Sequence, residues 1–174
     1  MTARHPLIGH LVNMVDREDR GALAVLRRAA SAEPGCSADS FPHVLPWVPE
    51  DARRNGDEDL YFLVATLFAI HPDHRETGNF GATMWRTATD GGAEPNPSAD
   101  LRFRRILEAN RSDLPDLMRQ AVRMAATRSS SVAIDYDLLL TQLQSWDHPT
   151  RWVQREWARS YWSPNDESSR TTGA

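Results

Sequence analysis

The stretch SADLRFRRILEANRSDLPDLMRQAVRMAATR, residues 98–128, decides the fold of this 174-residue chain. It holds seven arginines against four acids, and two helical patterns follow one another within it. In the second pattern, apolar residues recur three or four positions apart, as on one face of a helix: Leu114, Leu117, Met118, Ala121, Val122 and Ala125. In the first pattern, one face of about 100° of arc carries Phe103, Ile106, Leu107 and Asn110. The stretch therefore predicts two packed amphipathic helices.

Some arginines of this stretch are predicted to lie opposite the apolar faces, while the borders of the first face carry Arg102, Arg104 and Arg111. Arg119 and Arg123 share the solvent side of the second helix, and Arg105 points away from the apolar side of the first. Some arginines have acids at helical spacing, but four have few such partners: Arg102, Arg105, Arg119 and Arg123. A single helical arginine is usually solvated surface, whereas a cluster without acidic partners suggests an anionic ligand.

Helices are also predicted on both sides of this stretch. LYFLVATLFAI, residues 60–70, is apolar nearly all round and follows three acids, which favour a helix start, so it is the predicted central buried helix. Short amphipathic helices precede it at 7–15 and 22–29, and FPHVLPWVP has too many prolines for a long helix. After residue 133, one helix carries Tyr136, Leu139, Leu140, Leu143 and Trp146, and the last carries Val153, Trp157 and Tyr161 on its core side. No segment alternates as a strand does, so the predicted fold class is all-α.

The predicted organisation is a two-lobed helical bundle. Residues 73–97 are rich in glycine and proline and are predicted to form a long irregular loop. The loop also separates an acidic part, with 9 arginines and 14 acids in residues 1–99, from a more basic part. We therefore predict an N-terminal helical lobe over 1–96, which includes the loop, a C-terminal helical lobe over 97–163, and a disordered tail over 164–174.

The overall composition limits the possible functions. The net charge of −4 does not by itself indicate nucleic-acid binding, but all 20 basic residues are arginine, so any phosphate contact would use a bidentate guanidinium. The single cysteine, Cys36, excludes an internal disulfide and belongs to no metal-ligand pattern. The sequence shows no signal peptide and no apolar run of membrane-spanning length, which predicts a cytoplasmic protein without membrane association.

The sequence contains no catalytic signature. His71 and His74 are not completed into a metal site, and the glycines match no phosphate-binding loop. Asp135 and Asp137 stand at a helix start, where capping explains them better than catalysis. We therefore predict that the protein is not an enzyme and has neither a metal nor a cofactor.

The features that remain are arginines on helical faces with tryptophans beside them. A secondary basic stripe is predicted on the last helix: Arg151, Arg155 and Arg159. Such arrays suit a sugar-phosphate backbone, whose charges repeat at fixed spacing. Trp152 and Trp162 lie next to the stripe and could stack on unpaired bases, contact a protein, or simply pack in the core.

Taken in order, these segments resemble a known family. The sequence from ALAVLRRAA through FPHVLPWVP, LYFLVATLFAIHP, the NFG loop, LRFRRILEANRSDLPDLMRQAVRMA and IDYDLLLTQLQSWD to VQREWARSYW is similar to the CasB family, the small subunit of the type I-E CRISPR surveillance complex Cascade. The resemblance covers about residues 7–162 and rests on the order and spacing of the segments.

The resemblance implies an all-helical, two-lobed subunit without enzymatic activity. Its implied partners are the crRNA-containing complex with its backbone and large subunits, a second copy of itself, and the single-stranded non-target DNA of an R-loop. By position in the motifs, the implied nucleic-acid contacts are Arg27 and Arg28 of LRR, Arg102 and Arg105 of RFRR, and then Arg111, Arg119 and Arg123.

Two other functions stay open on the sequence alone. A helical protein-interaction adaptor would pair its arginines with acids on a partner and anchor through Trp152 and Trp162, without direct nucleic-acid contact. A small helical hydrolase would need a metal or cofactor that the sequence does not supply.

Overall fold

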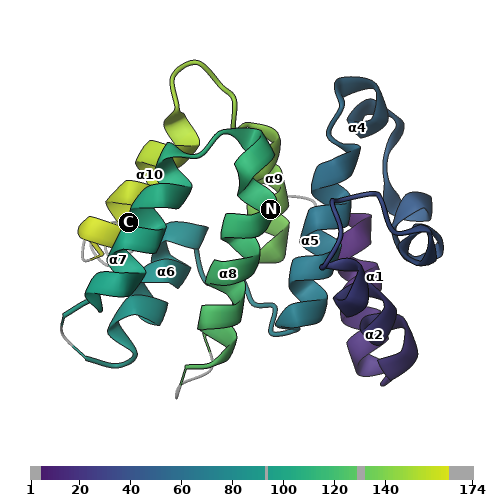
Figure 1. Ribbon diagram of the computed structural model, residues 1–174, viewed down its shortest axis with the longest axis horizontal. Coiled ribbons are helices and arrows are strands. Elements are labelled where there is room, and N and C mark those ends of the chain that lie inside the picture. The colour runs from purple at the N-terminus through teal and green to yellow at the C-terminus, as the bar shows by residue number, and fades with distance from the viewer. Residues whose placement is uncertain (1–4, 93, 129–131, 165–174) are drawn as a thin grey trace, which may run out of the picture.

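The computed structural model describes residues 5–92, 94–128 and 132–164, and this part of the chain is all-α, as predicted (Figure 1). Its α-helices are α1 (Pro6–Asp16), α2 (Arg20–Ala29), α3 (Phe41–Val44), α4 (Glu50–Asn55), α5 (Glu58–Ile70), α6 (Phe80–Thr89), α7 (Pro97–Glu108), α8 (Leu114–Ala126), α9 (Tyr136–Gln144) and α10 (Trp152–Trp162). Three short 3₁₀ helices are η1 (Ala38–Ser40), η2 (Leu45–Trp47) and η3 (Arg111–Asp113). Residues 165–174 of the predicted tail lie outside the described residues.

Helix α5 is the central buried helix that the sequence predicts. Every residue from Leu60 to Ala69 is buried, and α1, α2, α8 and α9 pack around it. The helix ends at His71-Pro72, where the Tyr136 hydroxyl donates a hydrogen bond of 2.6 Å to the His71 carbonyl. Because apolar side chains cover the whole circumference of α5, the helices on both sides of it share one continuous core.

The prediction of an irregular loop over 73–97 is wrong for ten residues, which form α6. Asn79 caps this helix by accepting a hydrogen bond of 3.1 Å from the Ala82 amide, and its own amide donates to the Ser160 hydroxyl at 2.8 Å. Helix α6 packs most closely on α10 and also on α7 and α8. Glycine content was a misleading signal here, because Gly81 is a helical residue at a close contact between α6 and α10.

The division into two lobes stays a prediction. Helix α6 lies within the predicted N-terminal lobe of residues 1–96, yet its packing partners α7, α8 and α10 all belong to the other lobe. Residues Asp73 to Arg75 also pair with Ile134 through backbone hydrogen bonds of 3.0 and 3.3 Å. The segment before α6 is thereby fastened to the segment before α9.

The three tyrosines predict how stability depends on pH. Burial raises the pKa of Tyr161 to about 12, raises that of Tyr136 well above its usual 10.0, and raises that of Tyr61. A raised tyrosine pKa means that folding favours the neutral phenol, so this stabilisation is complete below pH 10.0 and is lost as the pH rises toward about 12. The chain has no lysine, whose titration would otherwise overlap with that of the tyrosines in this pH range.

We therefore expect the urea midpoint to fall as the pH is raised from about 9 to about 11. Tyr161→Phe should weaken this dependence above pH 10.0, because phenylalanine has no proton to lose. A midpoint that falls equally steeply in the variant would contradict the assignment to Tyr161.

Candidate nucleic-acid interface

Three of the predicted contacts with nucleic acid lie on α7 and α8 as exposed side chains. Arg102 and Arg105 stand three positions apart on α7, and Arg123 stands in the last turn of α8. Within the described ranges, no hydrogen bond or ion pair holds any of these three guanidinium groups. A guanidinium in this state can take a phosphate without first breaking an internal contact.

The two predicted arginines of α2 differ from each other. Both lie in the last turn of the helix and are exposed, and a cation is favourable there because the helix dipole places negative charge at this end. Arg27 donates from Nε to the Ala69 carbonyl at 3.0 Å, which links α2 to the end of α5. No such contact with the described residues holds the guanidinium of Arg28.

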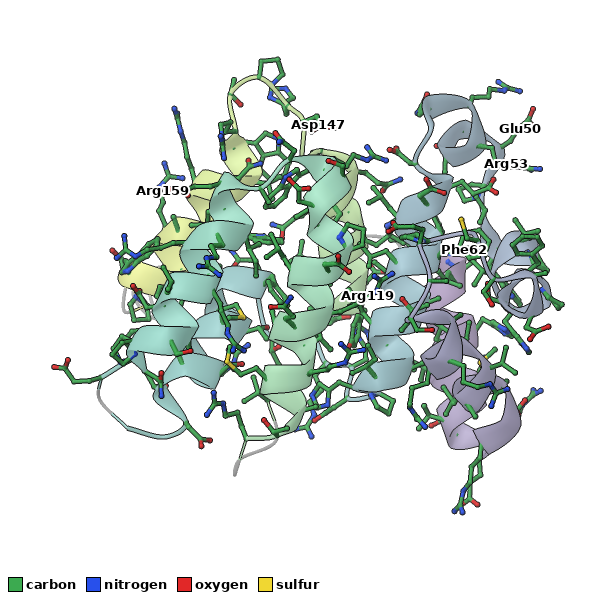
Figure 2. The ribbon with its side chains drawn as sticks, in the orientation of Figure 1. Glu50, Arg53, Phe62, Arg119, Asp147 and Arg159 are labelled. Atoms are coloured by element: carbon green, nitrogen blue, oxygen red, sulfur yellow. The ribbon has the colours of Figure 1, made fainter. Side chains whose placement is uncertain are left out.

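Arg119 is not on the solvent side of α8, and this prediction is wrong. Its exposed fraction is 5%, and its guanidinium donates to the Ala32 carbonyl at 2.7 Å and to Asp116 at 3.0 Å. Figure 2 shows Arg119 between α8 and the segment that follows α2. The pattern of α8 alone placed Arg119 opposite the apolar face, but a neighbouring segment covers that side of the helix as well.

Arg111 is also occupied by contacts within the chain. It lies in η3 and donates to a carboxylate oxygen of Asp57 at 2.7 Å and to the Gly56 carbonyl at 3.0 Å. Both side chains of this ion pair are largely buried. The Arg111 side chain therefore joins the start of α8 to the start of α5, and it is less available to a phosphate than Arg102 or Arg123.

The secondary basic stripe is exposed along α10, as its spacing predicts, while Val153, Trp157 and Tyr161 are fully buried on the other side. The members of the stripe differ in their contacts. Arg151 donates to the Leu107 carbonyl, Arg159 pairs with Glu156 at 2.5 Å, and no described residue holds Arg155 by a hydrogen bond or ion pair.

The two tryptophans beside the stripe are partly exposed, at 38% for Trp152 and 42% for Trp162. Trp162 is not free on both faces, because the guanidinium of Arg104 lies 4.9 Å from its ring centroid. Arg104 is held in turn by Asp100 at 2.8 Å. The sequence analysis missed this contact, which adds to the packing of Phe103 on α7 against Tyr161 and Trp162 on α10.

The structure brings α2, α5, α7 and α8 into one row. Helix α7 packs on α8, α8 on α5, and α5 on α2, and Figure 1 shows α7 and α8 side by side. The contact between Arg119 and Ala32 lies between α8 and the end of α2. Arg123 is one turn beyond this contact on α8, and Arg28 is one turn before it on α2. Arg28 and Arg123 are thus each four residues along the chain from one partner of this contact.

Carboxylates interrupt the positive surface between α7 and α8. Arg105 lines a groove there together with Glu108, Asp113 and Asp116. Asp116 is engaged by Arg119, which reduces but does not remove the negative charge of the groove. We therefore expect Arg105 to contribute less to the binding of an anion than Arg102, which is not among the residues that line this groove.

Other kinds of site were sought in the described part of the chain. His71 Nε2 donates to the Val132 carbonyl at 2.8 Å, and His74 Nδ1 accepts from the Tyr136 amide at 3.2 Å, so both histidines take part in helix-end contacts. Among the described residues, no three side chains of the metal-binding types gather into a group that could hold an ion. None of the described helices is long and apolar enough to span a membrane.

Comparison with known proteins relates both the sequence and the fold to one family. The family model of the CRISPR-associated protein Cse2 matches residues 22–162. A CRISPR-associated protein Cse2 from Thermus thermophilus is 31% identical over 142 residues, which cover 81% of this chain and 78% of the relative.

Solved structures agree with the sequence comparison. The crystal structure of a Cse2-family CRISPR-associated protein from Thermus thermophilus superposes with a TM-score of 0.77 at 27% identity, covering 92% of this chain and 98% of that one. A chain of a CRISPR RNA-guided surveillance complex gives a TM-score of 0.71 at 24% identity, covering 96% and 99%. At this identity the second likeness concerns the fold alone.

Proposed function

The chain belongs to the CRISPR-associated Cse2 family, also called CasB, and from this premise we propose that it is a scaffold subunit of a type I-E CRISPR interference complex. In this role it binds nucleic acid without reading sequence and without catalysing a reaction. Its partners are the crRNA-containing complex, with its backbone and large subunits, and a second copy of itself. It stabilises the R-loop by holding the displaced non-target strand and supporting the guide and target strands.

One observation carries the nucleic-acid part of the proposal. Arg28, Arg102 and Arg123 are exposed on three helices of one row, and within the described ranges none is held by another side chain. Phosphates recur along a strand at regular spacing, so separated guanidinium groups can each take one without a base contact. The proposal therefore rests on Arg28, Arg102 and Arg123 rather than on Arg111 and Arg119.

Modest affinity is sufficient for this role. Forming an R-loop exchanges one duplex for another of similar stability, so a few contacts with the displaced strand can shift the balance. The acidic net charge of −4 is compatible with this, because charges further apart than about 10 Å are largely screened by salt and each proposed contact is local.

We expect salt-sensitive binding of single-stranded DNA by the isolated protein. In a fluorescence anisotropy titration, each phosphate contact should add about 0.7 to the slope of log affinity against log salt. Arg28→Glu, Arg102→Glu and Arg123→Glu should each lower the affinity by about 3- to 10-fold and reduce the slope, because each removes a phosphate contact and adds a repelled charge. Base composition of the strand should have little effect.

The matched control is Arg20→Glu, which makes the same charge change on an exposed residue at the opposite end of α2. This control should leave the slope of log affinity against log salt nearly unchanged. Since an isolated subunit can bind too weakly to measure, the same variants are compared in the reconstituted complex. If a reconstituted complex that carries Arg28→Glu, Arg102→Glu and Arg123→Glu together formed R-loops normally, the nucleic-acid role would be overturned.

The second candidate function is a protein-interaction adaptor without direct nucleic-acid contact. Trp152 is exposed, and Arg155, three positions further along α10, is also exposed and held by no described residue. Both features favour this function, since tryptophan and arginine are enriched among the residues that anchor protein interfaces. Two measurements separate the two functions: an adaptor should show no salt-sensitive binding of DNA even as the wild type, and Trp152→Ala with Arg155→Ala should abolish its assembly into the complex.

A further inference from the structure

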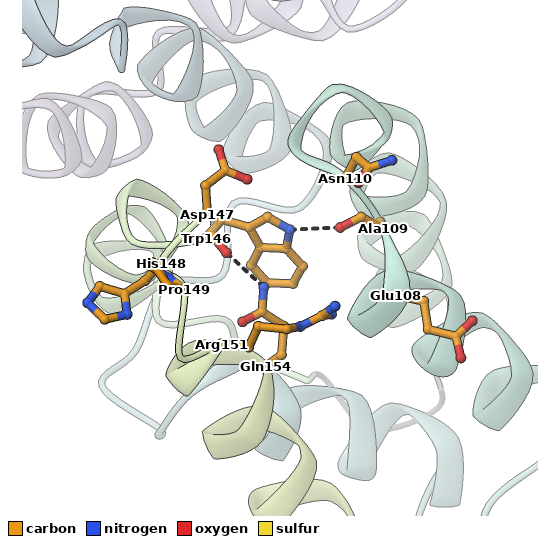
Figure 3. A pocket seen from close by; sticks show the side chains of 9 residues that line it. All are labelled: Glu108, Ala109, Asn110, Trp146, Asp147, His148, Pro149, Arg151 and Gln154. Carbon is orange, nitrogen blue, oxygen red and sulfur yellow. Dashed lines mark hydrogen bonds between the residues drawn. The ribbon is translucent and has the colours of Figure 1, made fainter.

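Trp162, at the end of α10, differs from the buried tryptophans that precede it. The exposed fraction of Trp146 is 2%, and its indole donates a hydrogen bond of 3.0 Å to the Ala109 carbonyl, as Figure 3 shows. The Trp157 indole is fully buried and donates to Gln142 at 2.7 Å. Trp162 is 42% exposed, and its indole N–H has no acceptor among the described residues. A large aromatic side chain is thus left in contact with solvent where the other two are enclosed.

Although it is exposed, the Trp162 ring is held in place by residues of α7 and α10. Its centroid lies 4.9 Å from that of Tyr161 and 5.6 Å from that of Phe103. The guanidinium of Arg104 lies over the ring at 4.9 Å and is fixed in turn by Asp100 at 2.8 Å. Because these contacts orient the ring before any ligand binds, little side-chain entropy is lost when a ligand contacts it.

The charges around Trp162 favour a negatively charged ligand. Helix α7 holds three arginines and two acids, and α10 holds two arginines and one acid. One acid on each helix already pairs with an arginine of the same helix. Arg155, two turns before Trp162 on α10, is exposed and held by no described residue. An aromatic ring among guanidinium groups suits a ligand that has both flat apolar faces and negative charge.

We propose that Trp162 and Arg104 form a platform on which an unpaired base of single-stranded DNA stacks. Bases stack on aromatic rings and on arginine guanidinium planes alike, so the two side chains can act together. This platform rests on the proposed function, which assigns phosphate contacts only, and adds a contact with a base. Arg102 lies on α7 two residues before Arg104, so α7 connects the platform to the proposed phosphate contacts.

Stacking would give the protein a preference that phosphate contacts cannot give. Phosphates line a duplex and a single strand alike, whereas the face of a base is covered inside a duplex and free in an unpaired strand. Because every base has such a face, the platform tolerates any sequence. It therefore selects a displaced strand without reading it.

The test compares two strands of equal length in fluorescence anisotropy titrations with the full chain. One is a thymidine strand, and the other has the same phosphates but abasic sugars throughout. The wild type should bind the thymidine strand at least about fivefold more tightly, because only this strand can stack. Trp162→Leu keeps an apolar side chain against Phe103 and Tyr161 but has no aromatic face, so it should bring the ratio of the two affinities close to one. Arg104→Gln should lower the ratio less, since the indole remains.

The matched control is Trp152→Leu. Trp152 is 38% exposed on the same helix, but no ring or guanidinium of a described residue lies against it. This variant should keep the preference of the wild type for the thymidine strand. Equal, salt-sensitive binding of both strands by the wild type, or an unchanged preference in Trp162→Leu, would overturn the platform and leave the phosphate contacts of the proposed function intact.

A second measurement applies to the reconstituted complex. The displaced strand carries 5-iodouracil at each position in turn, a base that crosslinks on irradiation to an aromatic side chain stacked on it. Trp162 should be the crosslinked residue of this chain. If the isolated wild type bound neither strand and Trp162 formed no crosslink in the complex, the platform would be overturned, whereas the proposed function would still be decided by R-loop formation with the three arginine reversals.

Discussion

Gly81→Ala is expected to destabilise the protein by about 3 kcal/mol or more, and to leave little folded protein if the wild type is only marginally stable. A methyl group at this position would lie 2.0 Å from the backbone oxygen of Trp157 and 2.6 Å from its carbonyl carbon. Overpacking a core usually costs about 1–3 kcal/mol, because neighbouring side chains can move aside. Here the obstacle is backbone, so α6 and α10 would have to separate.

Separation of these helices would disturb the aromatic core. Trp157 and Tyr161 are fully buried on α10, and the Trp157 indole lies 5.2 Å from the ring of Phe80 on α6 and donates to Gln142 at 2.7 Å. Moving α10 outward would weaken the packing of these rings and this hydrogen bond together. Chemical denaturation followed by tryptophan fluorescence measures the loss.

Gly9→Ala is the matched control for this substitution. Gly9 lies within α1, and a methyl group added there meets nothing within 4 Å. Alanine is the better helix former, so this variant should be more stable than the wild type by about 0.5–1 kcal/mol. If Gly81→Ala behaved like Gly9→Ala, the close contact between α6 and α10 would not be a constraint on the fold.

The sequence alone predicted those helices in which apolar residues recur at helical spacing or fill the whole helix. Helix α5 is apolar around its circumference, and α10 repeats Val153, Trp157 and Tyr161 at helical spacing, so both could be identified without knowledge of their neighbours. Helix α6 could not. Its residues include glycine and three threonines, which are poor helix formers, and its stability comes from the Asn79 cap and from packing on α10.

The same limit applies to the candidate site: the sequence predicted what depends on one helix, and missed what depends on contacts between distant segments. Spacing along a helix predicted correctly that Arg105 and Arg123 are exposed, because no other described segment covers those positions. It could not predict that Ala32, 87 residues away in the chain, accepts a hydrogen bond from Arg119.

Arg119→Ala is expected to lower the free energy of unfolding by about 2–3 kcal/mol. A hydrogen bond from a charged group contributes about 1.5–3 kcal/mol, and truncation would leave the Ala32 carbonyl without its donor. The buried stem of the side chain also packs between α8 and the segment after α2, and this packing would be lost. The ion pair with Asp116 adds little, since the Asp116 side chain is 79% exposed. Urea denaturation provides the measurement.

Arg123→Ala is the comparison that separates structure from binding. Arg123 is exposed one turn away on the same helix, so its removal should change stability by less than about 0.5 kcal/mol while weakening the binding of single-stranded DNA. Arg119→Ala should show the reverse, with reduced stability and near-normal binding wherever the variant remains folded. The opposite result, wild-type stability with weakened DNA binding, would mean that the Arg119 guanidinium leaves Ala32 to contact a phosphate, and the sequence-based assignment of Arg119 to the interface would then be correct.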